Sequence, residues 1–306
     1  MKRISIPLLA LTLFITSCSF PADNTSIPPP LQPATVLPST PPPTLPPATL
    51  SPTEASTIPT LPPKEIWYPP LGSTFSWQLG NSDEINTSFD VDIYDLDLFE
   101  TEASLISGLH SQGKMIFCYI SVGSWENWRP DAADFPSEII GKDYLGWPGE
   151  NWLDISQIDL LTSIMRARLD LCAAKGFDGI EPDNIDLHWA DTGFSITYED
   201  QLAYNIWLSE EAHARGLSIG LKNDDDQVED LLDYFDWALT EDCFDGEWCE
   251  KLLPFIEAGK PVFAAEYTDM IDYEEFKGDI CPHAKELGFY VFLKNRDLDE
   301  FREACP

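Results

Sequence analysis

The stretch Lys175-Gly-Phe-Asp-Gly-Ile-Glu-Pro-Asp-Asn-Ile-Asp186 decides which fold the sequence predicts. In it, a short apolar run of the buried-strand type leads directly into Glu181, Asp183 and Asn184. Carboxylates at the carboxyl end of a barrel strand project into one mouth, where burial and mutual repulsion separate their pKa values into those of an acid and of a base or nucleophile. The alternative is a helix start, with Pro182 in the first turn and Asp183 as the cap. The rest of the chain favours the strand.

Strands and helices alternate through residues 64–306. Apolar, β-rich runs that end in polar residues occur eight times, at 74–79, 91–95, 115–120, 177–180, 217–221, 237–240, 262–265 and 289–293. Helical patterns, most of them followed by glycine, occur at 102–112, 159–175, 199–215, 227–234, 250–258 and 273–287. This alternation predicts a parallel sheet, and eight strands predict a single closed (β/α)8 TIM barrel. A doubly wound open sheet is disfavoured because no glycine-rich phosphate loop follows the first strand.

The first 63 residues predict export and a tether. A positively charged start precedes an apolar run, 4–15, which is too short to span a bilayer but has the length of a signal-peptide core. The sequence that ends at Cys18, Ile-Thr-Ser-Cys, resembles a bacterial lipobox, so we expect residues 1–17 to be removed as a lipoprotein signal peptide and Cys18 to carry lipid. Ordinary signal cleavage is the alternative. Residues 18–63 hold 15 of the 26 prolines and predict a disordered, partly polyproline II stalk at the bacterial cell surface.

The charge is strongly negative, with 53 acidic and 18 basic residues and a net charge of −35. Two acids and two bases precede Lys64, so the whole net charge falls on residues 64–306. Such a field disfavours nucleic acid as a partner and favours a cationic substrate, for example a polysaccharide with free amino groups. The alternative explanation is solubility of an exported domain.

Polar side chains follow nearly every predicted strand, and in a barrel these positions surround the active site. The candidates are Gln78, Asp95, Tyr119, Ser121, Glu181, Asp183, Asn184, Lys222, Asn223, Glu241, Asp242, Glu266, Tyr267, Lys294 and Asn295. Tryptophans gather in the loops after the third and fourth strands, at positions 125, 128, 147, 152 and 189. We expect Trp125, which lies nearest to a strand end, to stack on sugar rings or on substrate ammonium groups.

Six ordered segments resemble glycoside hydrolase family 114, which comprises endo-α-1,4-polygalactosaminidases with a (β/α)8 barrel. They are Trp77-Gln-Leu79, Tyr94-Asp-Leu-Asp97, Cys118-Tyr-Ile-Ser-Val-Gly-Ser-Trp-Glu126, Gly179-Ile-Glu-Pro-Asp-Asn184, Gly220-Leu-Lys-Asn223 and Glu241-Asp-Cys-Phe244, spread over residues 65–306. The resemblance implies endo-acting hydrolysis of α-1,4-linked, galactosamine-containing polysaccharide. It also implies sugar contacts at Asn184, Lys222 and Asn223, and paired catalytic carboxylates after the fourth and sixth strands. Asp183 and Glu241 match that pair.

Hydrolysis of a glycosidic bond suits these residues. One carboxylate attacks the anomeric carbon or activates water, and a protonated partner donates to the leaving oxygen. We assign Asp183 as nucleophile and Glu241 as acid/base, with Glu181 or Glu266 as alternatives, because alternate residues at a strand end point into the mouth or away from it. If the resemblance extends to mechanism, the reaction retains configuration, with carboxyl groups about 5 Å apart.

The predicted substrate-binding residues are Trp77, Gln78, Asp95, Tyr119, Ser121, Trp125, Glu181, Asn184, Lys222, Asn223, Glu266 and Tyr267. Two alternatives to this function stay open. One is a barrel hydrolase that acts on another α-linked sugar, and the other is a non-catalytic surface module that binds glycan through the same cleft.

Six cysteines remain after Cys18, and in an exported protein an even number predicts disulfides. We expect Cys243–Cys249 to close a small loop behind Glu241, Cys281–Cys305 to fix the C-terminus, and Cys118–Cys172 to form as the remaining pair. The four histidines lack metal-ligand spacing, and the acidic clusters at 90–97 and 224–226 lack the pattern of an EF-hand. The sequence therefore predicts neither a required metal nor a cofactor. It leaves the oligomeric state open.

Overall fold

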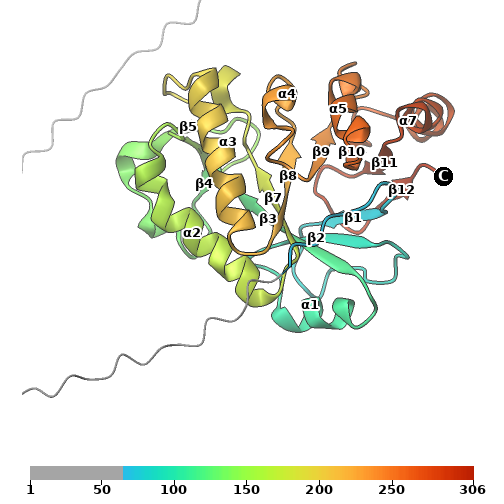
Figure 1. Cartoon of the computed structure of the whole chain (residues 1–306), viewed down its shortest axis with the longest axis horizontal. Coiled ribbons are helices and arrows are strands. Elements are labelled where there is room, and N and C mark those ends of the chain that lie inside the picture. Colours follow the sequence, from blue (N-terminus) through green and yellow to red (C-terminus); the bar gives the residue numbers. More distant parts are fainter. Residues whose placement is uncertain (1–64) are drawn as a thin grey trace, which may run out of the picture. The chain divides into compact units, whose positions relative to one another are not determined.

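Eight parallel strands form the centre of the fold (Figure 1). The computed structural model describes residues 65–306, so the predicted signal peptide, Cys18 and the predicted stalk lie outside the described residues. The parallel strands are β1 (Phe75–Gln78), β2 (Ile93–Asp97), β3 (Met115–Ser121), β7 (Gly179–Asp183), β8 (Ser218–Lys222), β9 (Trp237–Glu241), β10 (Val262–Tyr267) and β11 (Tyr290–Lys294). They are ordered in the sheet as in the chain, and a ninth strand, β12 (Glu303–Ala304), pairs antiparallel with β11. All eight predicted strands are thus confirmed.

The sheet is curled around a core of aromatic side chains. The ring of Phe75 on β1 lies 4.4 Å from that of Phe263 on β10 and 5.8 Å from that of Phe292 on β11, measured between centroids. The ring of Phe117 on β3 lies 4.4 Å from that of Trp237 on β9. Strands from the two ends of the sheet therefore face one another across a packed interior, as the inward-facing layers of a barrel do.

The two ends of the curl are separated by the C-terminal segment 298–305. On one side, this segment pairs with β11 through β12. On the other, the Leu298 carbonyl accepts from the amide of Leu79 at 3.1 Å, and Arg302 Nε donates to the carbonyl of Phe75 at 2.9 Å. Within residues 65–306, no ladder joins β1 to β11. The structure therefore shows a curled, mainly parallel sheet, whereas the predicted full closure of the barrel is not shown.

Helices lie around the outside of the parallel strands (Figure 1). They are α1 (Ala103–His110), α2 (Ile158–Lys175), α3 (Tyr198–His213), α4 (Val228–Leu231), α5 (Leu253–Glu257), α6 (Tyr273–Glu275) and α7 (Cys281–Leu287), and a π-helical turn (Phe276–Ile280) joins the last two. Helix α2 ends at Gly176 with a φ of 101°, the left-handed conformation predicted for the glycine after a helix. The predicted helix at 250–258 divides into a 3-10 turn (Cys249–Leu252) and α5, because Pro254 fits only the first turn of an α-helix.

A small antiparallel sheet, which sequence reasoning assigned to loops, is inserted between β3 and α2. Its strands are β4 (Ser124–Glu126), β5 (Ile140–Asp143) and β6 (Glu150–Leu153), in the order β4-β6-β5. The turn that leads into it requires glycine, because a Cβ on Gly123 would lie 1.8 Å from the carbonyl oxygen of Asn184. The small sheet is thereby held against the carboxyl end of β7.

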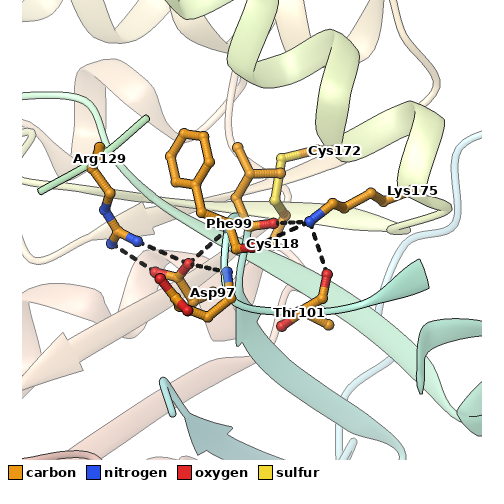
Figure 2. The surroundings of a disulfide bond; sticks show 9 residues. Asp97, Phe99, Thr101, Cys118, Arg129, Cys172 and Lys175 are labelled. Carbon is orange, nitrogen blue, oxygen red and sulfur yellow. Dashed lines mark hydrogen bonds and ion pairs between the residues drawn. A yellow bond between two sulfur atoms is a disulfide. The ribbon is translucent and has the colours of Figure 1, made fainter. Parts of the chain in front are cut away.

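The three predicted disulfides, Cys118–Cys172, Cys243–Cys249 and Cys281–Cys305, are present. Figure 2 shows the first of them, which joins β3 to α2. Beside it, the ammonium group of Lys175 donates to the carbonyls of Leu98 and Thr101, at 2.6 and 2.8 Å, and so fixes the loop after β2 to the same helix. None of the helices in residues 65–306 is long and apolar enough to cross a membrane.

Candidate active site

A cavity of about 830 Å³ opens where the parallel strands end. The predicted site residues that line it are Trp77, Tyr119, Asp183, Asn184, Lys222, Asn223, Glu241, Asp242 and Tyr267. They come from the carboxyl ends of β1, β3, β7, β8, β9 and β10 and from the residues just after them. The structure therefore brings together, in one cavity, side chains that the sequence places far apart.

Lys222 connects the carboxylates of this cavity. Its Nζ lies 2.7 Å from Asp183 Oδ1, 2.9 Å from Glu181 Oε1 and 3.1 Å from Glu241 Oε2, and 4.7 Å from the centre of the Trp77 ring. The side chain is only 2% exposed. Burial acts to lower the pKa of Lys222, but Asp183, Glu181 and Glu241 outweigh it and raise this pKa well above its usual value. Lys222 is therefore an ammonium ion placed between three carboxyl groups.

Asp183 is oriented by three neighbours. Its Oδ2 accepts a hydrogen bond from the Tyr119 hydroxyl at 3.0 Å and another from Asn184 Nδ2 at 3.1 Å, while Lys222 holds Oδ1. Asn184 has a φ of 64°, so the chain turns sharply after β7 and the Asn184 amide points back. That amide also donates to Ser121 Oγ at 3.0 Å. Ser121, predicted to contact substrate, is buried and instead supports Asn184.

Glu241 is held from both sides. The Tyr267 hydroxyl donates to Oε1, and Asn223 Nδ2 lies 3.5 Å from Oε2. Burial acts to raise the pKa of Glu241, but Lys222 and the bonds from Tyr267 and Asn223 lower it below its usual value. The side chain is therefore ionised in the free site. Because Lys222 Nζ contacts an oxygen of both Asp183 and Glu241, these two oxygens lie no more than about 6 Å apart.

Two predicted acidic residues, Glu181 and Asp95, are fully buried and do not line the cavity. Burial raises the pKa of Glu181 to about 8 against the opposing effect of Lys222. For Asp95, burial and the neighbouring Glu181 raise the pKa well above its usual value, and neither carboxyl oxygen has a hydrogen-bond partner in the structure. Both residues were predicted to contact substrate. The structure instead places them in the interior, where their protonated form is favoured.

Three further predicted residues support loops rather than the cavity. Gln78 is bonded to the backbone of Asn86, at 2.9 and 3.2 Å, and so fixes the loop between β1 and β2. The buried carboxylate of Glu266 accepts from the amides of Phe244 and Asp245, at 2.9 and 3.4 Å. The indole of Trp125 donates to the carbonyl of Ala132 at 2.9 Å, and this side chain does not line the cavity. The other four tryptophans of the predicted cluster, Trp128, Trp147, Trp152 and Trp189, do line it.

Several residues that line the cavity were missed by sequence reasoning. Burial, with Asp183 nearby, raises the pKa of Asp186 to about 7. The inserted sheet and the loops beside it contribute Tyr144, Glu126, Arg129 and Glu150. Asp186 ends the stretch from which the fold was predicted, so its nearness to Asp183 was the available signal. The residues of the insertion carried no such signal, because the small sheet itself was not predicted.

No group of three or more His, Cys, Asp or Glu side chains in residues 65–306 is arranged to hold a metal ion. The ammonium group of Lys222 lies among the carboxylates at the centre of the cavity. That the reaction needs neither a metal nor a cofactor stays a prediction.

A cavity lined by carboxylates and tryptophans at the carboxyl ends of parallel strands is typical of carbohydrate-cleaving enzymes. The model of glycoside-hydrolase family GH114 matches residues 57–306, and the chain belongs to this family. The protein is thus a glycosidase.

Two solved proteins resemble the chain over nearly their whole length. Aspergillus fumigatus Ega3, crystallised in complex with galactosamine, is 36% identical, with a TM-score of 0.74, over 79% of this chain and 98% of Ega3. The glycoside hydrolase domain of PelA from Pseudomonas aeruginosa is 15% identical, with a TM-score of 0.59, over 76% of this chain and 98% of that domain, and shows a shared fold. A comparison with curated proteins gave no match.

Proposed function

We propose that the protein is an endo-acting glycosidase that cleaves α-1,4-linked, galactosamine-containing polysaccharide. Membership of family GH114 and the likeness to Ega3, which was solved with galactosamine, support this class of substrate. The net charge of −35 suits a polymer with free ammonium groups. The observation that carries the proposal is the pair Asp183 and Glu241, both held by Lys222 in the cavity.

The proposed mechanism retains the anomeric configuration. Asp183 attacks the anomeric carbon while Glu241, protonated, donates to the leaving oxygen; Glu241 then takes a proton from the water that hydrolyses the glycosyl-enzyme. The limit of about 6 Å between their facing oxygens is compatible with the separation of about 5–5.5 Å that retaining enzymes have between the two carboxyl groups. Lys222 keeps Glu241 ionised in the free site. We infer that Glu241 takes up a proton from solvent when glycan binds, before it acts as the acid.

Release of reducing ends from partially deacetylated polygalactosamine tests the proposal. The full chain is compared with Asp183→Asn and Glu241→Gln, and with Glu286→Gln, a variant at an exposed position on α7, as the control. We expect each cavity variant to lose at least about a hundredfold in rate, since each removes a group that acts in the transition state. NMR of the first product formed reports whether configuration is retained.

Three results would contradict the proposal in different ways. Binding of the polymer by wild type without release of ends would favour a glycan-binding module. Release from another α-linked polysaccharide only would keep the hydrolase and change the substrate. Full activity in Asp183→Asn or Glu241→Gln would remove that residue from the catalytic pair and return the alternatives, Glu181 and Glu266.

We further propose that residues 1–17 are removed on export and that Cys18 carries lipid, so that the stalk 18–63 tethers the enzyme to a bacterial membrane surface. The lipobox-like sequence supports this location. In producing cells, labelled palmitate should be incorporated into the wild-type protein and not into Cys18→Ser, and equal labelling of both would refute the site.

We also propose that the parallel strands form a (β/α)8 barrel whose seam is filled by the segment 298–305, which contacts both β1 and β11.

A further inference from the structure

We propose that Glu126 and Glu150 form a subsite for the ammonium group of an amino sugar bound beside Asp183. This inference rests on the proposed function and narrows it to sugars with a free amine. In the antiparallel pair β4–β6, Glu126 and Glu150 stand directly opposite each other. Cross-strand partners project from the same face of a sheet, and both residues line the cavity.

The charges around this pair do not balance. Glu126 is 3% exposed; its Oε1 lies 2.7 Å from Arg129, while its Oε2 has no hydrogen-bond partner in the structure. Arg129 also binds Asp97 through both terminal nitrogens, at 2.9 and 2.6 Å (Figure 2). Glu150 Oε2 accepts from the Ser124 hydroxyl at 2.7 Å, which supplies no charge. Glu126 and Asp97 therefore share the guanidinium of Arg129, and the bond that Glu150 accepts comes from a neutral hydroxyl.

Such an arrangement is unfavourable unless a cation completes it. Like charges directly opposite in an antiparallel pair destabilise a sheet, and a buried carboxylate oxygen without a partner costs further free energy. Burial, together with Glu126 and Asp183, raises the pKa of Glu150 to about 7, so a proton compensates part of the charge in the free protein. A sugar ammonium group would replace that proton with three hydrogen-bond donors.

The subsite adjoins the proposed nucleophile. Asn184 Nδ2 donates to Asp183 Oδ2 at 3.1 Å and lies 3.5 Å from Ser124 Oγ, the hydroxyl that donates to Glu150. In agreement with this connection, the charge of Asp183 contributes to the raised pKa of Glu150. The Tyr119 hydroxyl in turn donates to Asp183. The charges that face Glu150 are thus Glu126 and Arg129 from the insertion and Asp183 from β7, with Tyr119 from β3 as a further titratable group. A sugar held at Asp183 places its amine, or that of the adjacent sugar, within reach of the pair.

Calorimetric titration of the full chain with D-galactosamine and with N-acetyl-D-galactosamine tests the subsite. We expect wild type to bind galactosamine more tightly than N-acetyl-D-galactosamine. In Glu150→Gln the ratio of these two affinities should fall roughly tenfold, as expected for the loss of a charged hydrogen bond. Affinity for N-acetyl-D-galactosamine, which lacks the charge, should not change. The Glu286→Gln control loses the same charge outside the cavity. An unchanged preference in Glu150→Gln, or no preference in wild type, would overturn the subsite.

The pH dependence of binding gives a second readout. Binding of a galactosamine ammonium needs Glu150 ionised and the sugar amine protonated. Wild-type affinity should therefore rise between about pH 5 and pH 7, below the range near pH 8 in which such amines lose their proton, and Glu150→Gln should flatten this rise. An equal slope in both proteins would count against the subsite. Glu126→Gln, whose stability is checked by thermal unfolding because Arg129 loses a partner, should also weaken the preference. Since monosaccharide binding needs no turnover, a retained preference without polymer cleavage would sink the hydrolase proposal and keep the subsite.

Discussion

At the scale of single residues, Lys222 determines the electrostatics of the cavity. Its ammonium group contacts Glu181, Asp183 and Glu241 together, and the side chain is almost fully buried. Each carboxylate has lost most of its hydration, and the ammonium group replaces it with a charge at hydrogen-bond distance. Lys222 therefore both stabilises the folded site and sets the protonation state of Glu241, which its charge keeps ionised.

We predict that Lys222→Met destabilises the protein by about 3 kcal/mol or more at pH 7, because removal of one partner of a buried ion pair leaves uncompensated charge. The loss of stability in Lys222→Met should be smaller at pH 5, because the carboxyl groups that Lys222 contacts then take up protons. Urea unfolding at both pH values measures it. The matched variant is Lys142→Met, whose partner Asp191 is exposed, and it should cost less than about 1 kcal/mol. Equal costs for the two variants would contradict this account.

The sequence predicted which residues meet at the cavity better than it predicted their depth. Asp183, Lys222 and Glu241 follow apolar runs, so their place at the strand ends could be inferred. Glu181 and Asp183 are two residues apart, which puts both on the same face of β7. Depth along the strand separates their roles: Glu181 is fully buried and Asp183 reaches the cavity. The predicted strand ended at residue 180, three residues early, so this difference in depth could not be seen.

At the scale of elements, the fit between β7 and the inserted sheet positions the cavity. Gly123 connects β3 to β4 and approaches the backbone of Asn184, which is also bonded to Asp183. Strands β4, β5 and β6 have three or four residues each and mix polar side chains with a few large apolar ones, such as Trp152 and Leu153. Such strands lack the apolar alternation by which the eight longer strands could be predicted. Tertiary packing holds them, including the rings of Tyr144 and Trp152, 3.8 Å apart.

We predict that Gly123→Ala destabilises the protein by at least about 2 kcal/mol and lowers activity, because the added Cβ would lie 1.8 Å from the Asn184 carbonyl oxygen and would displace the residue next to Asp183. Gly108→Ala is the matched control. A Cβ there meets no atom within 4 Å, and alanine in the interior of α1 should stabilise by roughly 0.5–1 kcal/mol. Chemical unfolding and polymer hydrolysis measure both. A stable, fully active Gly123→Ala would refute the close approach.

At the scale of the whole molecule, the negative net charge and the buried carboxyl groups together determine how stability depends on pH. The net charge of −35 could be read from the sequence, but burial of individual carboxyl groups could not. Burial raises the pKa of Glu266 to about 7, that of Glu181 to about 8 and that of Asp224 to about 9. The interruption between β1 and β11 was likewise outside the reach of pattern analysis, since the segment that fills it has no regular periodicity.

These raised pKa values predict that the protein is more stable at pH 5 than at pH 8. Below the ordinary carboxyl pKa near 4, these groups are protonated in both the folded and the unfolded protein. As pH rises above about 4, the unfolded chain releases its protons first, so the folded protein loses this stabilisation progressively, until the folded groups also ionise at about pH 7 to 9. Glu241 has a lowered pKa, so its contribution to stability increases with rising pH, but only below its ordinary pKa near 4. We expect Tm to be higher at pH 5 by at least about 5 °C. Part of this difference in Tm between pH 5 and pH 8 should remain at high salt. Salt screens the repulsion between surface charges, but it does not change the protonation of buried carboxyl groups. Asp224→Asn, whose amide resembles the protonated carboxyl group, should reduce the difference in Tm between pH 5 and pH 8. A Tm that is equal or higher at pH 8 would show that these carboxyl groups are ionised in the folded protein.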